Sequence, residues 1–516
     1  MCLWFKAGYG KGMGIDMQGF TKVDLVILVV YLAAVLFAGL YFAKKDMKGK
    51  EYFKGDGTVP WWVTSVSIFA TLLSPISFLS LAGNSYAGTW IMWFAQLGML
   101  LAIPLTIKFF LPIYSKLDID TAYHYLELRF ESKGLRVLGA VMFIIYQIGR
   151  MSIIMYLPCM VLGNLTGINI NLLIIIMGVI AIIYSYTGGL KSVLWTDFIQ
   201  GSVLLIGVTV ALLFLIAHID GGFGSIMQAF TQEGKFLAPD QPIFDINLLK
   251  DSVFLMIIGA GFNTMGSYVS SQDIVQRFTT TTDTKKLNKM MLTNGALSIF
   301  IATVFYLIGT GLYVFYKQNT LPPAAAQDQI FASYIAFELP VGVTGILLAA
   351  IYAASQSTLS TGLNSVAASW TLDIQARLSK KELSFEKQTK IGQYVSLLVG
   401  VFAIVVSIVL ANGGIKSAYE WFNGFMGLVL GILIGTFILG AFTKVANAFG
   451  TTIAFIAASI VMVSIKYIAP AGSVSIWAYS LISIAVSLAV GIPASIISRK
   501  IKGDNSAPAE NTTIYR

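Results

Sequence analysis

Charged residues are scarce in this sequence. Only 11% of its 516 residues are Asp, Glu, Lys or Arg, whereas 56% are hydrophobic and the mean hydropathy is +0.78. Soluble domains usually have about a quarter of their residues charged, so this composition excludes an ordinary soluble protein. The chain is predicted to be an all-α polytopic membrane protein.

Cysteine and histidine are also scarce. The two cysteines, Cys2 and Cys159, form no metal or redox spacing, and neither of the two histidines lies near a cysteine in the sequence. These absences exclude a disulfide framework and a zinc site. The sequence also places no nucleophile, base and orienting group at a shared level, which argues against an enzyme.

The net charge of +9 reflects topology rather than nucleic-acid binding. The basic residues form short clusters between apolar runs and make no basic face or aromatic-interleaved patch. Because Lys and Arg are retained on the cytoplasmic side, the clusters after the first, third, seventh and ninth spans place the N-terminus outside and the C-terminus inside. These clusters are Lys44, Lys45, Lys48, Lys50 and Lys54; Lys116, Arg129 and Lys133; Arg277, Lys285, Lys286 and Lys289; and Arg377, Lys380, Lys381, Lys387 and Lys390.

Apolar runs of about 20 residues are long enough to cross the bilayer core as helices. Such runs predict 13 transmembrane helices in this sequence. They lie at residues 23–43, 61–82, 89–114, 136–162, 170–186, 192–217, 252–269, 290–316, 340–373, 391–411, 418–443, 448–468 and 475–498. The first residues lack the features of a cleaved signal peptide, and Met17 would also be a sensible start.

The second span, which contains "SIFATLLSPISFLSLAG", has Pro75 between Ser74 and Ser77 near its middle. Proline removes a backbone donor and collides with the preceding turn, which frees carbonyl groups near Thr71. Freed carbonyls at this depth could line a polar cavity and bind a small cation. The alternative is a simple proline kink.

Two further polar residues lie at the depth of this break. Helical rise places Ser74, Arg150 and Gln96 at roughly 20 Å from the cytoplasmic edge. A cation at mid-membrane should face a cavity or a partner, and no acidic residue of the neighbouring spans is expected at the level of Arg150. Arg150 therefore suits the carboxylate of an anionic ligand. Alternatively, it binds the free carbonyls of the broken helix and is structural.

The ninth span crowds hydroxyl groups onto adjoining faces within "AASQSTLSTGLNS". Ser357, Thr358, Ser360 and Thr361 could coordinate a hard cation such as Na⁺. Equally, small hydroxyl residues allow membrane helices to pack closely. Asp197, in "GGLKSVLWTDFIQG", is predicted at the same inner level and favours a cation or proton site. An exposed helix N-terminal cap is the alternative for Asp197.

Breaks at matching positions suggest two inverted halves. The seventh span, "FLMIIGAGFNTMGSYVS", is predicted to be interrupted around Gly259, Gly261, Asn263, Thr264 and Gly266. Spans 2–6 and 7–11 then form two five-helix units of opposite orientation. The predicted division is an extracellular segment (1–22), an additional N-terminal helix (23–43), two repeats (61–217 and 252–443), two C-terminal helices (448–498) and a cytoplasmic tail (499–516).

Several motifs together resemble one transporter family over residues 17–500. They are "YFKGDGTVPWWVTSVSIFATLLSPISFLS", "TAYHYLELRF", "IGRMSIIMYL", "YTGGLKSVLWTDFIQG", "SQDIVQRF" and "AAIYAASQSTLSTGLNS". The chain is identified by these motifs as similar to the sodium:solute symporter family, which has the LeuT-like fold with a 5+5 inverted repeat. Within that family it most resembles the bacterial sialic acid transporters.

The resemblance implies two Na⁺ sites and a substrate site. In the substrate site Arg150 holds the carboxylate, and Ser74, Ser77 and Gln96 contact the rest of the sugar. Leu72, Phe262 and Asn263 complete this set. Two of these positions depart from the branch: Leu72 replaces a threonine, and the asparagine of the seventh span, Asn263, is displaced by one position. Pro75 also replaces a serine, and Met92 replaces an aromatic residue. The implied Na⁺ sites are Ala70, Leu73, Ala354, Ser357 and Thr358 for the first, and Asp197, Ser357, Ser360 and Thr361 for the second.

The expected function is Na⁺-coupled import of sialic acid by alternating access. The expected cargo is N-acetylneuraminic acid with two Na⁺ ions, carried across a bacterial cytoplasmic membrane by a functional monomer. Within transport, the alternatives are proline, another monocarboxylate or a neutral sugar, the last of which Arg150 disfavours. A Na⁺-dependent receptor or channel is the alternative from another class, and the short tail argues against a receptor.

Overall fold

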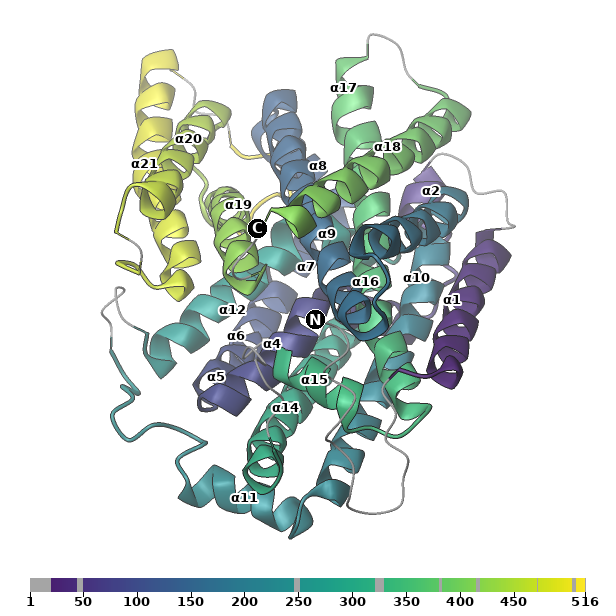
Figure 1. Cartoon of the computed structure of the whole chain (residues 1–516). Coiled ribbons are helices and arrows are strands. Elements are labelled where there is room, and N and C mark those ends of the chain that lie inside the picture. Colours follow the sequence, from purple (N-terminus) through teal and green to yellow (C-terminus); the bar gives the residue numbers. More distant parts are fainter. Residues whose placement is uncertain are drawn as a thin grey trace.

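Every regular element that the structure describes is a helix (Figure 1). The computed structural model describes residues 20–43, 50–245, 251–320, 329–379, 383–413, 418–470, 472–503 and 507–515. In chain order the elements are α1 (Lys22–Ala43), α2 (Lys50–Lys54), α3 (Trp61–Leu72), α4 (Pro75–Ala87), η1 (Ile91–Trp93), α5 (Phe94–Leu97), α6 (Met99–Leu105), η2 (Thr106–Phe110), α7 (Leu111–Leu117), α8 (Ala122–Phe130), α9 (Lys133–Thr166), α10 (Ile170–His218), α11 (Gly222–Gln232), α12 (Val253–Ser270), α13 (Gln272–Phe278), α14 (Thr284–Gln318), α15 (Ile330–Phe337), α16 (Val343–Ala368), η4 (Ser369–Gln375), α17 (Ala376–Leu378), α18 (Phe385–Asn412), α19 (Ala418–Phe442), α20 (Ala448–Tyr467), η5 (Ile476–Ala478) and α21 (Tyr479–Lys502).

The predicted all-α membrane architecture is confirmed. Within the described residues, 10 helices are long and apolar enough to cross a membrane, and the bent pair α3–α4 makes up to 11. Shorter apolar helices, Ile170–Ile183 and Leu428–Phe442, lie where the fifth and eleventh spans are predicted. The total of 13 spans, the orientation of the termini and the division into two repeats stay predictions.

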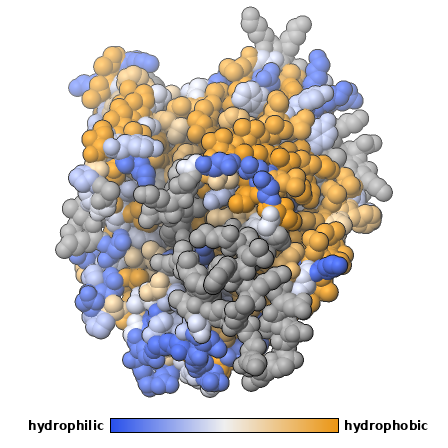
Figure 2. All heavy atoms as spheres, in the orientation of Figure 1, coloured by the Kyte–Doolittle hydropathy of each residue, from blue (hydrophilic) through white to orange (hydrophobic). Residues whose placement is uncertain are grey.

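Large apolar side chains are exposed on the outer helices. On α18 these include Val401, Phe402, Val405 and Val409, and on α1 they include Phe37. Figure 2 shows the corresponding broad apolar surface on the upper right, where α18 lies in Figure 1. Side chains of this kind are stable at the surface when lipid, rather than water, surrounds them.

Helix α16 lies in the centre of the bundle, and nearly all of its residues are buried. It packs against α3, α9, α10 and α18, so the hydroxyl groups of the ninth predicted span face other helices and not lipid. The additional helix α1 also packs on it. One carboxyl oxygen of the buried Asp24, in α1, accepts from the backbone N–H groups of Gly342 and Gly345, each at 2.8 Å. Asp24 thereby caps the start of α16 from a different helix.

The predicted spans 170–186 and 192–217 form the two parts of α10, which separate at Gly189. This glycine has φ 55° and ψ −163°, a conformation that L side chains avoid. A Cβ atom at this position would also lie 2.7 Å from the carbonyl oxygen of Tyr52. Only glycine fits here, and the break directs the second part of α10, with Asp197, along α16.

Two arginines counted among the loop charges are buried and lie in helices, Arg129 in α8 and Arg277 in α13. The side of the membrane on which they lie stays a prediction. Arg129 donates to the carbonyl oxygens of Gly440, Thr443 and Ala446 at 2.7–3.3 Å and thereby satisfies the end of α19. Arg277 is fully buried within the bundle. Part of the predicted tail also packs on the bundle, because Ile514 donates its N–H to the carbonyl oxygen of Ala441 at 3.0 Å.

Candidate functional site

The second span is broken, and Pro75 begins a helix. Helix α3 ends at Leu72, α4 starts at Pro75, and the two helices are bent by 64°. Ser74 caps α4 by accepting the N–H of Ser77 at 3.3 Å. Proline lacks an N–H that the first position of a helix does not use, so it fits there without cost. The kink alternative is therefore wrong: the proline and the two hydroxyl groups are the start of α4.

The seventh span is also broken, but at a different place from the one predicted. Helix α12 runs without interruption through Gly259, Gly261 and Gly266. The break is at Ser271, an extended residue with φ −91° and ψ 117°, and α13 follows it. The glycines serve close packing instead: a Cβ atom on Gly98 would lie 2.5 Å from the backbone nitrogen of Gly261.

The first predicted cation site is a cluster of neutral oxygen atoms. The Ser357 hydroxyl lies 3.0 Å from the carbonyl oxygen of Ala70 and 3.2 Å from that of Ala354. The Thr358 hydroxyl lies 3.1 Å from the Ala354 carbonyl oxygen and 3.4 Å from that of Thr71. All of these residues are buried. Leu73, the fifth predicted member, is the extended residue just after α3. The cluster joins the end of α3 to the middle of α16 through groups that suit Na⁺.

The second predicted cation site is built around a buried carboxyl group. Asp197 accepts from the hydroxyls of Ser360 at 3.3 Å and Thr361 at 3.2 Å, as predicted for a shared level. Ser67, which was not predicted, also donates to it, at 2.6 Å. Asp197 has no exposed surface and lies eight residues after Gly189, so the alternative of an exposed N-terminal cap is wrong. The Ser357 hydroxyl belongs to the first cluster, while its carbonyl oxygen accepts from Ser360.

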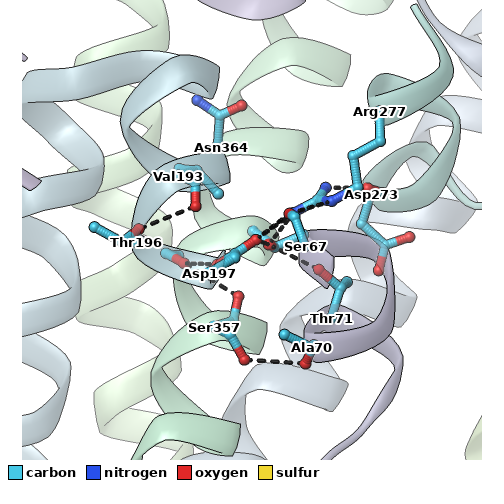
Figure 3. Close-up of polar contacts among 12 residues, drawn as sticks. Ser67, Ala70, Thr71, Val193, Thr196, Asp197, Asp273, Arg277, Ser357 and Asn364 are labelled. Carbon is cyan, nitrogen blue, oxygen red and sulfur yellow. Dashed lines mark hydrogen bonds and ion pairs between the residues drawn. The ribbon is translucent and has the colours of Figure 1, made fainter. Parts of the chain in front are cut away.

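Arg277 forms a buried ion pair with the Asp197 carboxyl group (Figure 3). Its Nη2 lies 2.7 Å from Asp197 Oδ2 and 2.5 Å from Thr361 Oγ1, and its Nε lies 2.9 Å from Ser67 Oγ. Sequence reasoning missed this contact because Arg277 was counted among the loop charges. The signal that could have shown it is its position after the second helix break, within the quoted motif "SQDIVQRF".

Arg150 lies between the two broken helices. Its Nη2 donates to the carbonyl oxygen of Thr71, at the end of α3, at 2.6 Å. Its Nη1 lies 2.6 Å from Oδ2 of Asp273, in the first turn of α13. The expectation that no acidic partner lies at this level was wrong, because Asp273 follows the break. In this conformation Arg150 makes the bond of the structural alternative, to the freed carbonyl oxygen of Thr71, and also the ion pair with Asp273.

The remaining predicted substrate residues are spread over four helices. Ser77 lies in α4 beside Ser74, Leu72 ends α3, and half-buried Gln96 is in α5. Phe262 and Asn263 are in α12, which packs against α5. The Asn263 side-chain oxygen accepts from Ser480 of α21 at 3.4 Å. Among the described contacts, none links the hydroxyls of Ser74 and Ser77 directly to the Arg150 guanidinium.

Comparisons with known proteins agree on one family. The model of the Sodium:solute symporter family matches residues 52–458. The sodium/sialic acid symporter SiaT of Proteus mirabilis (strain HI4320) is 32% identical over 502 residues, which are 96% of this chain and 100% of that protein. The sodium/sialic acid symporter NanT of Aliivibrio fischeri is 31% identical over 92% of this chain and 94% of its own length.

Solved structures show the same relationship. A substrate-bound, outward-open Na⁺-coupled sialic acid symporter matches with a TM-score of 0.87 and 32% identity, covering 95% of this chain and 99% of that one. Mhp1, a nucleobase-cation-symport-1 family transporter, matches with a TM-score of 0.59 and 15% identity, covering 89% of this chain and 96% of its own. The second likeness concerns the fold alone, which is the predicted LeuT-like fold.

Proposed function

The chain belongs to the sodium:solute symporter family, and from this premise we propose that it imports sialic acid together with Na⁺ by alternating access. It is a multi-pass membrane transporter and not an enzyme. The two relatives named as sodium/sialic acid symporters support the substrate. The observation that carries the proposal is the position of Arg150, a buried cation between two broken helices and beside the hydroxyl cluster of α16.

Arg150 is proposed to bind the substrate carboxylate. A guanidinium group can hold a carboxylate through two charge-assisted hydrogen bonds, which gives both affinity and orientation. Ser74, Ser77, Gln96, Leu72, Phe262 and Asn263 are proposed to surround the remainder of the sugar. Substrate would compete with Asp273 for the guanidinium group, because this acid is the ion-pair partner of Arg150 in the described conformation.

Two Na⁺ ions are proposed as the coupled cargo. One binds the oxygens of Ala70, Leu73, Ala354, Ser357 and Thr358, and the other binds Asp197 with Ser357, Ser360 and Thr361. The first ion would bridge α3 and α16 and stabilise one relative position of these helices. Each net positive charge that moves inward gains about 2.3 kcal/mol per 100 mV of membrane potential. Two ions can therefore drive accumulation of an anionic substrate.

The proposed setting is the cytoplasmic membrane of a bacterium, with the N-terminus outside and the C-terminus inside. The two relatives, from Proteus and Aliivibrio, support a bacterial inner membrane. One chain contains both proposed cation sites and Arg150, so a functional monomer is sufficient. Nucleic acid has no proposed role.

Uptake into liposomes tests the proposal. The protein is reconstituted, and radiolabelled N-acetylneuraminic acid is added with an inward Na⁺ gradient, with equal Na⁺ on both sides, or with choline in place of Na⁺. Accumulation above the equilibrium level is expected only with the gradient, and protein-free liposomes provide the background. Absence of uptake in all three conditions would contradict sialic acid as the substrate. The same assay with proline and lactate then tests the alternative cargoes.

A further inference from the structure

Helix α13 is a short element whose seven residues are all buried. It contains one acidic residue, Asp273, and one basic residue, Arg277, four positions apart. Buried charges in a helix of this length are costly unless each has a partner. The partners are not each other. Asp273 is paired with Arg150, and Arg277 is paired with Asp197.

The Asp273 carboxyl group occupies the position at which the proposed substrate carboxylate would bind. Its Oδ2 lies 2.6 Å from Arg150 Nη1, and its other oxygen accepts from the hydroxyl of Ser271, at the helix break. Figure 3 shows the carboxyl group directed away from Arg277. An anion of this chain therefore holds the guanidinium group that the substrate would need.

Arg277 occupies the corresponding place in the second cation site. Its guanidinium group contacts Asp197, Ser67 and Thr361 at 2.5–2.9 Å. A Na⁺ ion bound to Asp197 and Thr361 would have to replace these contacts. One helix thus presents a carboxylate to the substrate site and a cation to the ion site.

We propose that Asp273 and Arg277 are internal substitutes for the two cargoes and that their joint displacement couples substrate binding to Na⁺ binding. This inference rests on the proposed function. When both cargoes bind, both side chains are released together. They are then an acid and a base at positions i and i+4 of one helix, with the acid nearer the N-terminus, which is the favourable order for an ion pair. Arg277 already donates to the backbone carbonyl oxygen of Asp273.

Binding of one cargo alone is unfavourable in this scheme. Substrate alone would release Asp273 while Arg277 stays on Asp197, and Na⁺ alone would release Arg277 while Asp273 stays on Arg150. Each case leaves a buried charge without a full partner. Every charge is paired only when both sites hold α13 side chains or when both hold cargo. Two sites linked in this way have a reciprocal coupling free energy.

The surroundings of α13 allow such a rearrangement. Ser271 separates it from α12, and the residues after its last turn, Thr279–Thr282, border an open cavity of about 400 Å³. Lys54, Gly55 and Gly57 line the rest of this cavity. The helix therefore has a break at one end and space beside the loop at its other end.

Equilibrium binding of N-acetylneuraminic acid to the purified full-length protein tests the inference. In the wild type, affinity in saturating Na⁺ should exceed affinity in choline by a factor on the order of 5–150, the usual range for coupled sites. In Asp273→Asn this factor should fall toward one, mainly because binding without Na⁺ becomes tighter. Asp273→Glu keeps the charge and should keep most of the Na⁺ dependence. If Asp273 had a purely structural role, Asp273→Asn would bind the sugar more weakly in both Na⁺ and choline. Either that result or an unchanged ratio of the two affinities would overturn the inference.

A variant of the basic residue, Arg277→Gln, tests the same coupling by measuring Na⁺ binding. It can replace Asp273→Asn if that variant does not fold. Arg277→Gln frees Asp197, so binding of radioactive sodium without sugar should increase and should no longer respond to sugar. Sodium binding that stays as weak and as sugar-dependent as in the wild type would refute the role of Arg277. Wild-type sugar binding that is equal in Na⁺ and choline would refute the coupling without any variant. Wild-type protein that binds no N-acetylneuraminic acid contradicts the proposed function, whereas sodium binding to Arg277→Gln still tests the substitution of Na⁺ by Arg277.

Discussion

The two proposed cation sites lie on the same helix, α16, and differ in charge. The first contains hydroxyl and carbonyl oxygens only, and these groups already bond to one another. The second contains the carboxyl group of Asp197 and is paired with Arg277. A neutral cluster can be empty of ions at little cost because its own hydrogen bonds satisfy it. A buried carboxylate without a partner is costly, so the second site needs either a cation or a proton whenever it is not paired with Arg277.

Because of this difference in charge, substitutions in the two sites should affect Na⁺ binding and the stability of the fold differently. Loss of an oxygen from the neutral site should weaken Na⁺ binding while the fold stays nearly as stable. Loss of the carboxyl group from the charged site should reduce both Na⁺ binding and the stability of the fold, because a buried arginine loses its partner. The variants below test this separation, beginning with the largest expected effect.

Asp197→Asn is expected to abolish Na⁺-driven uptake and to destabilise the protein. Arg277 would be left buried without an opposite charge, which costs about 3–5 kcal/mol. Thermal unfolding in detergent and gradient-driven uptake measure the two effects. The double variant Asp197→Asn/Arg277→Gln should recover most of the lost stability and none of the uptake. A melting temperature of Asp197→Asn equal to that of the wild type would show that the charged site does not depend on its ion pair.

Arg150→Ala should reduce uptake of carboxylated sugars to the background level. The lost charge-assisted contact is worth about 2–5 kcal/mol, and Asp273 would also lose its partner. Arg150→Lys keeps the charge but cannot reach both Thr71 and Asp273 with a planar fork, so partial activity is expected. Radiolabelled uptake at saturating Na⁺ is the measurement. Near-normal transport by Arg150→Ala would contradict the carboxylate assignment and leave Arg150 a purely structural role.

The sequence predicts the elements whose pattern is local. Apolar runs predict the helices, the "LLSPIS" stretch predicts the first break, and the hydroxyls at positions 357–361 predict the buried polar cluster of α16. Asp197 and Thr361 are predicted at one level by counting helical rise alone, and the structure brings them to 3.2 Å.

Contacts of residues that follow a break in a helix cannot be predicted by counting helical rise. Depth can be calculated only along a continuous helix, and α13 follows the extended residue Ser271. Asp273 and Arg277 therefore looked like residues of a loop, although both enter the site. The second break was predicted at the glycines of α12, which is the wrong place, because glycine marks close packing as well as irregular backbone, and Gly261 packs on Gly98.

Ser357→Ala should raise the Na⁺ concentration for half-maximal uptake roughly tenfold, which corresponds to about 1.4 kcal/mol and to the loss of one polar ligand. Stability should change less, because only neutral hydrogen bonds are removed. Ser365→Ala is a matched control: this hydroxyl is also buried in α16, but it donates to the carbonyl oxygen of Gly362 at 3.1 Å, outside both sites. An equal change in Na⁺ dependence for the two variants would show that the effect comes from α16 as a whole.

Asp24→Ala should lower stability and have no effect on Na⁺-driven uptake. The carboxyl group caps α16 at Gly342 and Gly345, at the opposite end of the helix from Thr361, and such a cap is worth about 1–2 kcal/mol. Asp24→Asn keeps one oxygen acceptor and should lose less. Melting temperatures measure the cost, and the Na⁺ concentration for half-maximal uptake should match that of the wild type. A shift in this concentration would mean that the start of α16 is coupled to the cation sites, and that α1 acts on ion binding through its contact with this helix.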